Sequence, residues 1–241
     1  MIHWIRLEAG KANAMSAQLL DVIERAFDEF EATDARAAII TGYDRFFSAG
    51  LALPTLIDLD RPAMKRFIER FDAVMERVFR CPRPVVAAVN GHAIAGGCVL
   101  LLQADWRIAA DGDFKMGLNE VQLGIGLPGI VLGTLRRKVP ASSLAPIALE
   151  GELFSPRRAH ALGLVEELAP PAELEARALA QAQALAAVPA AAFAQVKAQL
   201  ARPVLEAIAR ENAVESWLDT WFSPEARPRL RAAVDRLQKE K

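Results

Sequence analysis

The sequence predicts an α/β fold with largely parallel strands, followed by a helical C-terminal region. Apolar runs at 37–40 and 85–89 have the length and composition of buried strands, and a glycine follows each within two residues. Segments with helical spacing separate these runs, which is typical of crossover connections between parallel strands. From about residue 130 the chain changes to helix after helix, so we divide it into an α/β core, 1–150, and a helical region, 151–241.

Capping residues define the helices of the core. Ser16 suits the N-cap of a helix that runs to about Phe30, and Pro62 suits the first turn of the next helix. In both segments apolar side chains recur at helical spacing and so form one buried face. The other elements that we expect in the core are a helix opened by Gly96-Gly97 and short strands at 106–110 and 114–116.

Prolines organise the C-terminal region. Ser155-Pro156 starts a helix and Gly163 ends it, as the preferences of helix caps predict. Prolines then separate four Ala- and Leu-rich stretches that we expect to be helices: Pro171, Pro189, Pro203 and Pro224. The last stretches carry more apolar side chains than a small core should need, which favours an oligomer; they include Trp217, Leu218, Trp221 and Phe222.

Composition excludes several classes of function. Lysine and arginine number 29 against 30 aspartate and glutamate, which gives no reason to expect a nucleic-acid or membrane-surface partner. Cys81 and Cys98 form no disulfide framework, and with three scattered histidines they show no metal-binding spacing. The N-terminus lacks the pattern of a signal peptide. We therefore expect a soluble, cytoplasmic protein without a metal site.

One segment has the length and apolarity of a membrane span. Residues 84–102 contain only two polar side chains, Asn90 and His92. However, Asn90-Gly91 is a turn signal, and the glycine pair at 96–97 marks a second break. A strand, a turn and a buried helix therefore explain this segment better than a single transmembrane helix.

The segment GLNEVQLGIGLPG, residues 117–129, supports two hypotheses. Its glycines match the spacing of a dinucleotide-binding loop, and Glu150 lies where a ribose-binding acid would stand. Against this, the residues before the glycines are too polar for a central strand, and Pro128 removes one N–H donor. The other hypothesis rests on Glu120, because its mostly apolar surroundings would raise its pKa and make it a proton shuttle near neutral pH.

Two glycine-containing corners supply what a lone base lacks. Residues 47–53 follow the first buried strand, and residues 90–98 follow the second. Backbone N–H groups at such corners are unobstructed by side chains, and two of them that meet at one point form an oxyanion hole. Ser48 does not fit a nucleophile elbow, because Phe46 stands where that turn requires glycine.

These separated motifs resemble the enoyl-CoA hydratase/isomerase (crotonase) superfamily. The similarity runs from Asn13-Ala14-Met15 through FSAGLAL, AAVNGHAIAGGC and GLNEVQLGI to the C-terminal helices. The resemblance implies a crotonase-like (ClpP/crotonase) fold, a spiral of stacked ββα units with a helical C-terminal region for packing and trimerisation. It also implies an acyl-CoA thioester substrate, no cofactor beyond the coenzyme A of that substrate, and a homotrimer or dimer of trimers.

The resemblance also assigns roles to individual residues. Glu120 would be the catalytic base, and the backbone N–H groups of Leu51 and Gly96 would form the oxyanion hole for the thioester carbonyl. The residues that would contact the substrate are Lys11, Ala12, Asn13, Ala49, Leu53, Gly97 and Asn119.

Val99 is the main departure from the family pattern. Hydratases of this family place a second glutamate there, which activates water, so the sequence is most similar to the Δ3,Δ2-enoyl-CoA isomerase branch. Leu51 also favours that branch, since hydratases usually have alanine at its position. The expected reaction is isomerisation of 3-enoyl-CoA to trans-2-enoyl-CoA. Hydration or another CoA-thioester reaction is one alternative, and a non-catalytic acyl-CoA-binding protein is another.

Overall fold

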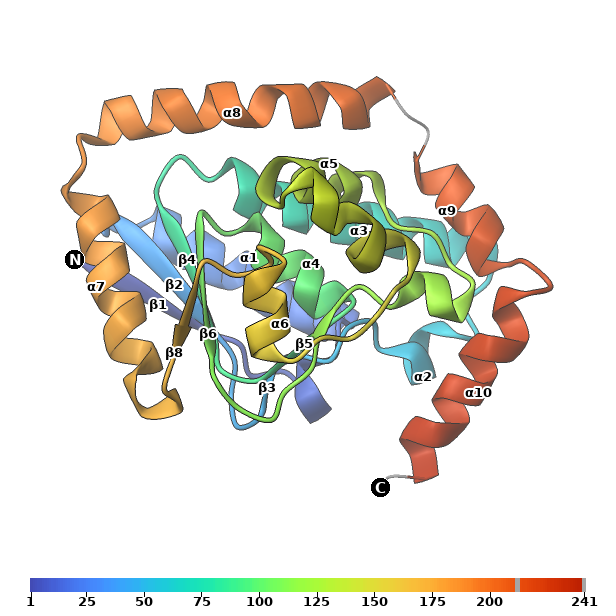
Figure 1. Cartoon of the computed structure of the whole chain (residues 1–241). Helices are drawn as coiled ribbons and strands as arrows, with labels where there is room; N and C mark the ends of the chain where they lie inside the picture. Colours follow the sequence, from blue (N-terminus) through green and yellow to red (C-terminus); the bar gives the residue numbers. More distant parts are fainter. Residues whose placement is uncertain (211–212, 240–241) are drawn as a thin grey trace.

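Five parallel strands form the main sheet of this computed structural model, which describes residues 1–210 and 213–239 (Figure 1). Neighbouring strands pair in parallel register throughout this sheet. Their spatial order is β1 (Ile2–Arg6), β2 (Ala37–Thr41), β4 (Val85–Val89), β6 (Trp106–Ala110) and β8 (Glu167–Ala169).

A second sheet has three parallel strands, in the order β3 (Phe46–Ser48), β5 (His92–Ile94) and β7 (Met116–Gly117). Each of them follows a strand of the main sheet along the chain and precedes a helix, which confirms the predicted spiral of ββα units. β7 begins two residues later than the strand predicted at 114–116. The reason is a tight turn, in which the Phe114 N–H donates to the Gly112 carbonyl at 3.0 Å and so is not available for sheet pairing.

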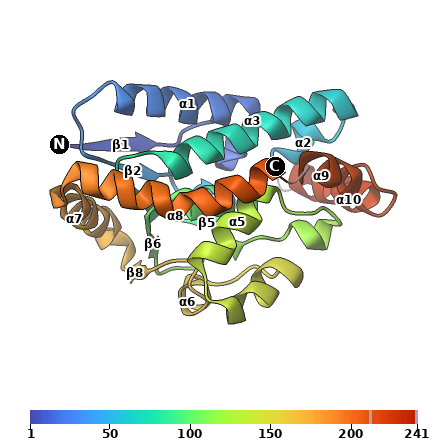
Figure 2. The ribbon, with the colours of Figure 1, turned by 90° about the horizontal axis from the view of Figure 1, so that it is seen from above.

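Helices enclose both sheets, as Figure 2 shows from above. The longer ones are α1 (Ala17–Glu31), α3 (Arg61–Arg80), α4 (Gly96–Gln103), α5 (Gly129–Lys138), α7 (Leu174–Ala187), α8 (Ala190–Arg210), α9 (Ala213–Trp221) and α10 (Ala226–Lys239). The shorter ones are α2 (Leu53–Leu56), α6 (Pro156–Ala161), η1 (Lys11–Asn13), η2 (Glu120–Leu123), η3 (Ala141–Ser143), η4 (Ala145–Leu149) and η5 (Pro171–Glu173).

Both faces of the main sheet are buried. Ile40 of β2 belongs to the large core that includes residues of α1, α3 and α4, whereas its neighbour Ile39 belongs to a smaller core under α7. Parallel strands joined by helices are covered on both sides, so their sequences are apolar without alternation. This explains why the runs at 37–40 and 85–89 were recognisable as strands.

The predicted helix starts in the core are confirmed. The Ser16 hydroxyl accepts a hydrogen bond from the Leu19 N–H at the start of α1. Pro62 stands in the first turn of α3, and Asp60 caps that helix by accepting from the Ala63 N–H at 2.8 Å. Capping side chains satisfy N–H groups that have no partner inside the helix.

The C-terminal region contains a strand that the sequence did not predict. β8 pairs with β6 at the edge of the main sheet, within the region expected to be wholly helical. With three residues it is too short to show a recognisable periodicity. The regions 1–150 and 151–241 therefore share one sheet, and α7 covers a face of it.

Pro203 does not separate two helices, because α8 continues through it. Ala201 and Val204 beside it are buried, and Val204 packs so closely on α5 that a Cβ atom at Gly133 would lie 2.6 Å from it. This packing outweighs the one backbone hydrogen bond that a proline removes from a helix. The predicted break at Pro203 is therefore wrong.

The apolar segment at 84–102 forms β4, β5 and most of α4 in the interior, as the turn signals predicted. Within residues 1–210 and 213–239, no single helix has the length and apolarity needed to cross a membrane. The segments Pro171–Ala187 and Ala190–Ala209, bent by 101°, meet that test only as a pair, by length and composition alone.

Candidate active site

Glu120 stands at the start of η2, three residues after β7. Its side chain is buried, and its Oε2 atom has no hydrogen-bond partner among the described residues. Burial raises the pKa of this carboxyl group from 4.5 to about 7, and a hydrogen bond from its own backbone N–H offsets part of the change. Near neutral pH the group can therefore both accept and donate a proton.

A small cavity opens onto Glu120. The described residues that line it are Leu51, Ile68, Phe71, Gly96, Val99, Glu120, Pro128 and Trp217. Glu120 is the only one of these with an ionisable side chain, and the other walls are largely apolar. Walls of this kind exclude water and keep the carboxyl group desolvated, which agrees with its raised pKa.

Leu51, the first residue predicted to form the oxyanion hole, lies on a corner that is paired with Met15. The Met15 N–H donates to the Gly50 carbonyl at 2.7 Å, and the Met15 carbonyl accepts from the Ala52 N–H at 3.0 Å. Successive N–H groups of an extended chain alternate in direction, so the Leu51 N–H faces away from Met15. Nothing in residues 1–210 or 213–239 accepts a hydrogen bond from it.

Gly96, the second predicted residue, opens α4, where N–H groups have no partner inside the helix. The described part of the chain supplies no other acceptor for the Gly96 N–H. Ala95 precedes it with φ 48°, a left-handed conformation that is unfavourable for alanine and is concentrated at functional sites. A Cβ atom on Gly50 would lie 2.8 Å from the Ala95 Cβ, so glycine allows the two corners to touch.

The glycine-rich loop at 124–129 is a seat for the C-terminal helices. The Gly126 N–H donates to the Thr220 hydroxyl of α9 at 2.9 Å, and a Cβ atom on Gly124 would lie 3.1 Å from the Cα of Ala226 in α10. Before the loop stands the short helix η2, where a dinucleotide-binding loop requires a strand. The dinucleotide-binding hypothesis is therefore wrong, because this loop binds the protein's own helices.

The sequence profile of enoyl-CoA hydratases and isomerases matches residues 1–227. The chain belongs to the enoyl-CoA hydratase/isomerase family. A protein of Bacillus subtilis (strain 168), named a probable enoyl-CoA hydratase, is 38% identical over 200 residues, covering 81% of this chain and 73% of the relative. The human mitochondrial delta3-delta2-enoyl-CoA isomerase structure is 26% identical with a TM-score of 0.93, covering 100% of this chain and 95% of that one.

A third relative is an enoyl-CoA hydratase/isomerase from Xanthobacter autotrophicus Py2. Its structure is 28% identical with a TM-score of 0.83, covering 99% of this chain and 94% of that chain. The predicted superfamily and its crotonase-like fold are thereby confirmed. A mixed α/β core with C-terminal helices is common to these structures.

In this chain, the side chain of Asn13 forms its hydrogen bonds with backbone groups of the protein. Asn13 is fully buried, its Nδ2 donates to the Leu7 carbonyl at 2.7 Å, and its Oδ1 accepts from the Ala9 N–H at 2.9 Å. The Asn13 side chain therefore has a structural role in the loop, and the substrate contact expected of this residue stays a prediction. Beside it, Lys11 is exposed and Ala12 has a left-handed φ of 59°.

Ala49 and Leu53 frame the first corner. The Ala49 N–H donates to the Ala12 carbonyl at 3.0 Å, which brings together the segments 11–13 and 49–53. Leu53 begins α2, and its N–H donates to the Leu51 carbonyl at 2.7 Å. This bond uses the carbonyl of Leu51 and leaves its N–H group available.

Gly97 and Asn119 are the remaining residues predicted to contact the substrate. A Cβ atom on Gly97 would lie 2.2 Å from the Ser48 carbonyl oxygen, so this glycine serves the packing of α4 on β3. Asn119 adjoins Glu120, and its Oδ1 is buried without a partner among the described residues, as the carboxyl Oε2 is. Ser48 donates to the Asn13 carbonyl at 2.7 Å, which agrees with a structural role.

Val99 lies one turn after Gly96 on α4, is buried, and lines the cavity that Glu120 enters. The position where hydratases have a second glutamate therefore lines the cavity. In this chain it carries the isopropyl side chain of valine instead of a carboxyl group. None of the other described lining residues adds a second carboxyl group beside Glu120.

Four residues of the cavity wall are not predicted from the sequence: Ile68, Phe71, Pro128 and Trp217. Helical spacing had marked Ile68 and Phe71 as buried, but not which cavity they reach. The apolar surplus that the sequence predicts for oligomer contacts includes Trp217, Leu218 and Trp221. All three are buried inside this one chain, so that argument for an oligomer is wrong.

A second carboxyl group with a raised pKa lies outside the cavity wall. Burial, and then the charge of Glu76, raises the pKa of Asp72 on α3 to about 7. Its Oδ1 has no partner among the described residues. Asp72 adjoins Phe71 along the chain but is absent from the lining that surrounds Glu120.

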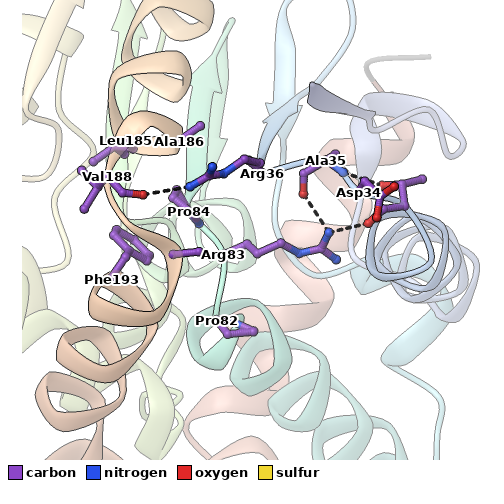
Figure 3. A pocket seen from close by; sticks show the side chains of 12 residues that line it. Asp34, Ala35, Arg36, Pro82, Arg83, Pro84, Leu185, Ala186, Val188 and Phe193 are labelled. Atoms are coloured by element: carbon purple, nitrogen blue, oxygen red, sulfur yellow. Dashed lines mark hydrogen bonds between the residues drawn. The ribbon is translucent and has the colours of Figure 1, made fainter.

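Figure 3 shows a hollow at the opposite ends of the main-sheet strands, between their N-terminal ends and the α7–α8 turn. Two arginines cross it. Arg36 donates to the Val188 carbonyl at 3.0 Å, and Arg83 donates to the carbonyls of Thr33 and Ala35 at 2.8 Å each. Because backbone carbonyls use these guanidinium groups, we assign the hollow a structural role.

Proposed function

We propose that this chain isomerises 3-enoyl-CoA to trans-2-enoyl-CoA, with Glu120 as a single proton shuttle. The observation that carries the proposal is the composition of one cavity. It combines a buried carboxyl group with a pKa of about 7, two residues whose N–H groups are unpaired, and Val99 where a second carboxyl group would serve hydration. Similarity to the human delta3-delta2-enoyl-CoA isomerase over the full chain supports it.

The reaction needs one proton to move between two carbons. The thioester oxygen accepts hydrogen bonds from the N–H groups of Leu51 and Gly96. The C2–H bond breaks, its proton passes to the Glu120 carboxylate, and its electron pair forms the dienolate with negative charge on that oxygen. Glu120 returns the proton to C4 while the double bond moves to C2–C3. One base suffices, and conjugation of the product supplies the direction.

The magnitudes expected from these groups are substantial. A pre-oriented oxyanion donor stabilises the transition state by about 3 kcal/mol, and a positioned general base contributes about 10²- to 10⁴-fold in rate. The partial positive charge at the N-terminus of α4 adds to the stabilisation, since Gly96 is its first residue.

Hydration of 2-enoyl-CoA is the second candidate, because the Bacillus subtilis relative is named a probable enoyl-CoA hydratase. Hydration requires a group that holds and activates the attacking water. The apolar Val99 and the other walls leave Glu120 as the only ionisable side chain for this purpose among the described lining residues. We therefore propose that hydration is near zero.

The proposal extends to partners. Coenzyme A enters as part of the substrate, with Lys11 and the corner at 49–53 on its side of the site, and no separate cofactor takes part. We further propose a homotrimer or dimer of trimers that uses the region 151–241, and a cytoplasmic role in acyl-CoA metabolism of the fatty-acid type. These proposals rest on the family resemblance.

Two parallel assays test the proposed reaction. Incubation with trans-3-hexenoyl-CoA should produce ultraviolet absorbance from the conjugated thioester, whereas trans-2-hexenoyl-CoA should keep its absorbance. Loss of absorbance in the second assay alone would favour hydration. Neither change, with acyl-CoA bound, would favour a non-catalytic acyl-CoA-binding protein.

A further inference from the structure

The cavity at Glu120 is closed by a residue from the C-terminal part of the same chain. Trp217 of α9 is 2% exposed and lines that cavity together with Ile68 and Phe71 of α3. The volume of this cavity is about 10 Å³. This is below the roughly 300–1,000 Å³ typical of ligand pockets, so the cavity is small for a long acyl chain.

The indole of Trp217 is held in place from behind. It stacks on Trp221, with ring centroids 5.2 Å apart and planes at 22°. The Thr220 hydroxyl, between them in sequence, accepts from the Gly126 N–H of the glycine-rich loop at 2.9 Å. The wall therefore rests on an aromatic partner and on the loop that follows Glu120.

Ion pairs join α9 to the helix that carries the other walls. Arg61 of α3 contacts Glu215 at 2.9 Å and Asp219 at 2.6 Å, and Lys65 contacts Glu215 at 2.6 Å. Each pair is partly exposed and contributes little by itself. Together they connect α9 to the same helix as Ile68 and Phe71, so the walls contributed by α3 and α9 form one unit.

We propose that Trp217 is the residue that limits acyl chain length, which makes short-chain thioesters of about four to six carbons the substrates. The inference rests on the proposed function. With the thioester oxygen at Leu51 and Gly96, and C2 and C4 beside Glu120, the carbons beyond C4 meet the apolar walls. A close-packed interior does not admit extra methylene groups without displacement of its side chains.

Binding of saturated acyl-CoA thioesters tests this limit without turnover. Calorimetry would compare butanoyl-, hexanoyl-, octanoyl- and decanoyl-CoA. For the wild type, affinity should stop rising beyond hexanoyl-CoA. For Trp217→Ala, each further methylene group that becomes buried should tighten binding by about fourfold, so the decanoyl-to-hexanoyl affinity ratio should rise at least about tenfold.

Two variants serve as controls. Trp221→Phe is the matched control, because Trp221 supports the wall without lining the cavity, and its chain-length profile should follow the wild type. Trp217→Leu keeps apolar packing and carries the same test if the alanine variant fails to fold. A melting curve of each variant establishes which of them is folded.

The outcomes separate the inference from the proposed function. A wild-type affinity that keeps rising to decanoyl-CoA, or a chain-length profile unchanged in both folded Trp217 variants, would overturn the inference while the isomerase could stand. Absence of isomerisation with every 3-enoyl-CoA, together with the predicted binding profile, would overturn the proposed function alone. No binding of any acyl-CoA would overturn both.

Discussion

Replacing Glu120 by glutamine should make the protein more stable at alkaline pH. Burial raises the pKa of this carboxyl group from 4.5 to about 7, so the folded state holds the proton more tightly than the unfolded state. Stability is therefore lost as pH rises from about 4.5 to about 7, and the loss persists above that range. A difference of about 2.5 pKa units corresponds to a loss of about 3 kcal/mol in the free energy of unfolding. The glutamine variant does not lose this stability, because its side chain does not ionise.

The measurement is thermal unfolding of Glu120→Gln and of the wild type from pH 4 to pH 9, which gives the difference in stability at each pH. The difference should grow in favour of glutamine by about 3 kcal/mol, or roughly 6–12 °C for a chain of this size. The same variant should lose at least about 10² in kcat, with little change in KM, because the base acts in the transition state. Parallel pH dependences for the two proteins would refute the reasoning about burial, and wild-type isomerisation by the variant would remove Glu120 from the mechanism.

Four further outcomes are expected, the first three from the geometry of the site and the last from the family resemblance. Val99→Glu should give measurable hydration of 2-enoyl-CoA, and like charges should raise the pKa of at least one carboxyl group, Glu120 or the new one; unchanged hydration would contradict the assigned role of this position. Gly97→Ala should destabilise the protein by about 1–3 kcal/mol in a melting experiment, because its Cβ would lie 2.2 Å from the Ser48 carbonyl oxygen. Ala95→Gly should raise stability by about 1 kcal/mol by relieving the left-handed conformation, and a lower melting temperature would speak against strain there. Sedimentation at micromolar concentration should show a trimer or hexamer, and a monomer would contradict the proposed assembly.

Much of the fold could be predicted because the main sheet is buried on both faces. The strands at 85–89 and 106–110 appear with the predicted bounds, since continuous apolar runs of this length have few other stable arrangements. β8 could not be predicted, because three residues carry no periodicity. The continuous α8 could not be predicted either, because the packing of Val204 on α5 is a tertiary effect that the sequence around Pro203 does not reveal.

The candidate site, like the fold, could be predicted from the sequence only in part. Local motifs identified Glu120 and the corners at 47–53 and 90–98, and the family resemblance singled out Leu51 and Gly96. These three residues line one cavity. Its remaining walls come from segments far apart in the chain, and their meeting depends on how α3 and α9 pack. Glycine spacing alone does not reveal what packs on 124–129, because a glycine permits close approach by any group, including the protein's own α9 and α10.

The seating of α9 on the glycine-rich loop has a consequence for protein synthesis. A ribosome makes the strands, Glu120 and the loop before it makes Trp217, so the carboxyl group exists for some time without its last wall. Burial raises the pKa of this carboxyl group, and Trp217 contributes part of that burial, so the shift is complete only after α9 has docked. The order of the chain therefore makes the complete desolvation of Glu120 depend on the helices that are synthesised last.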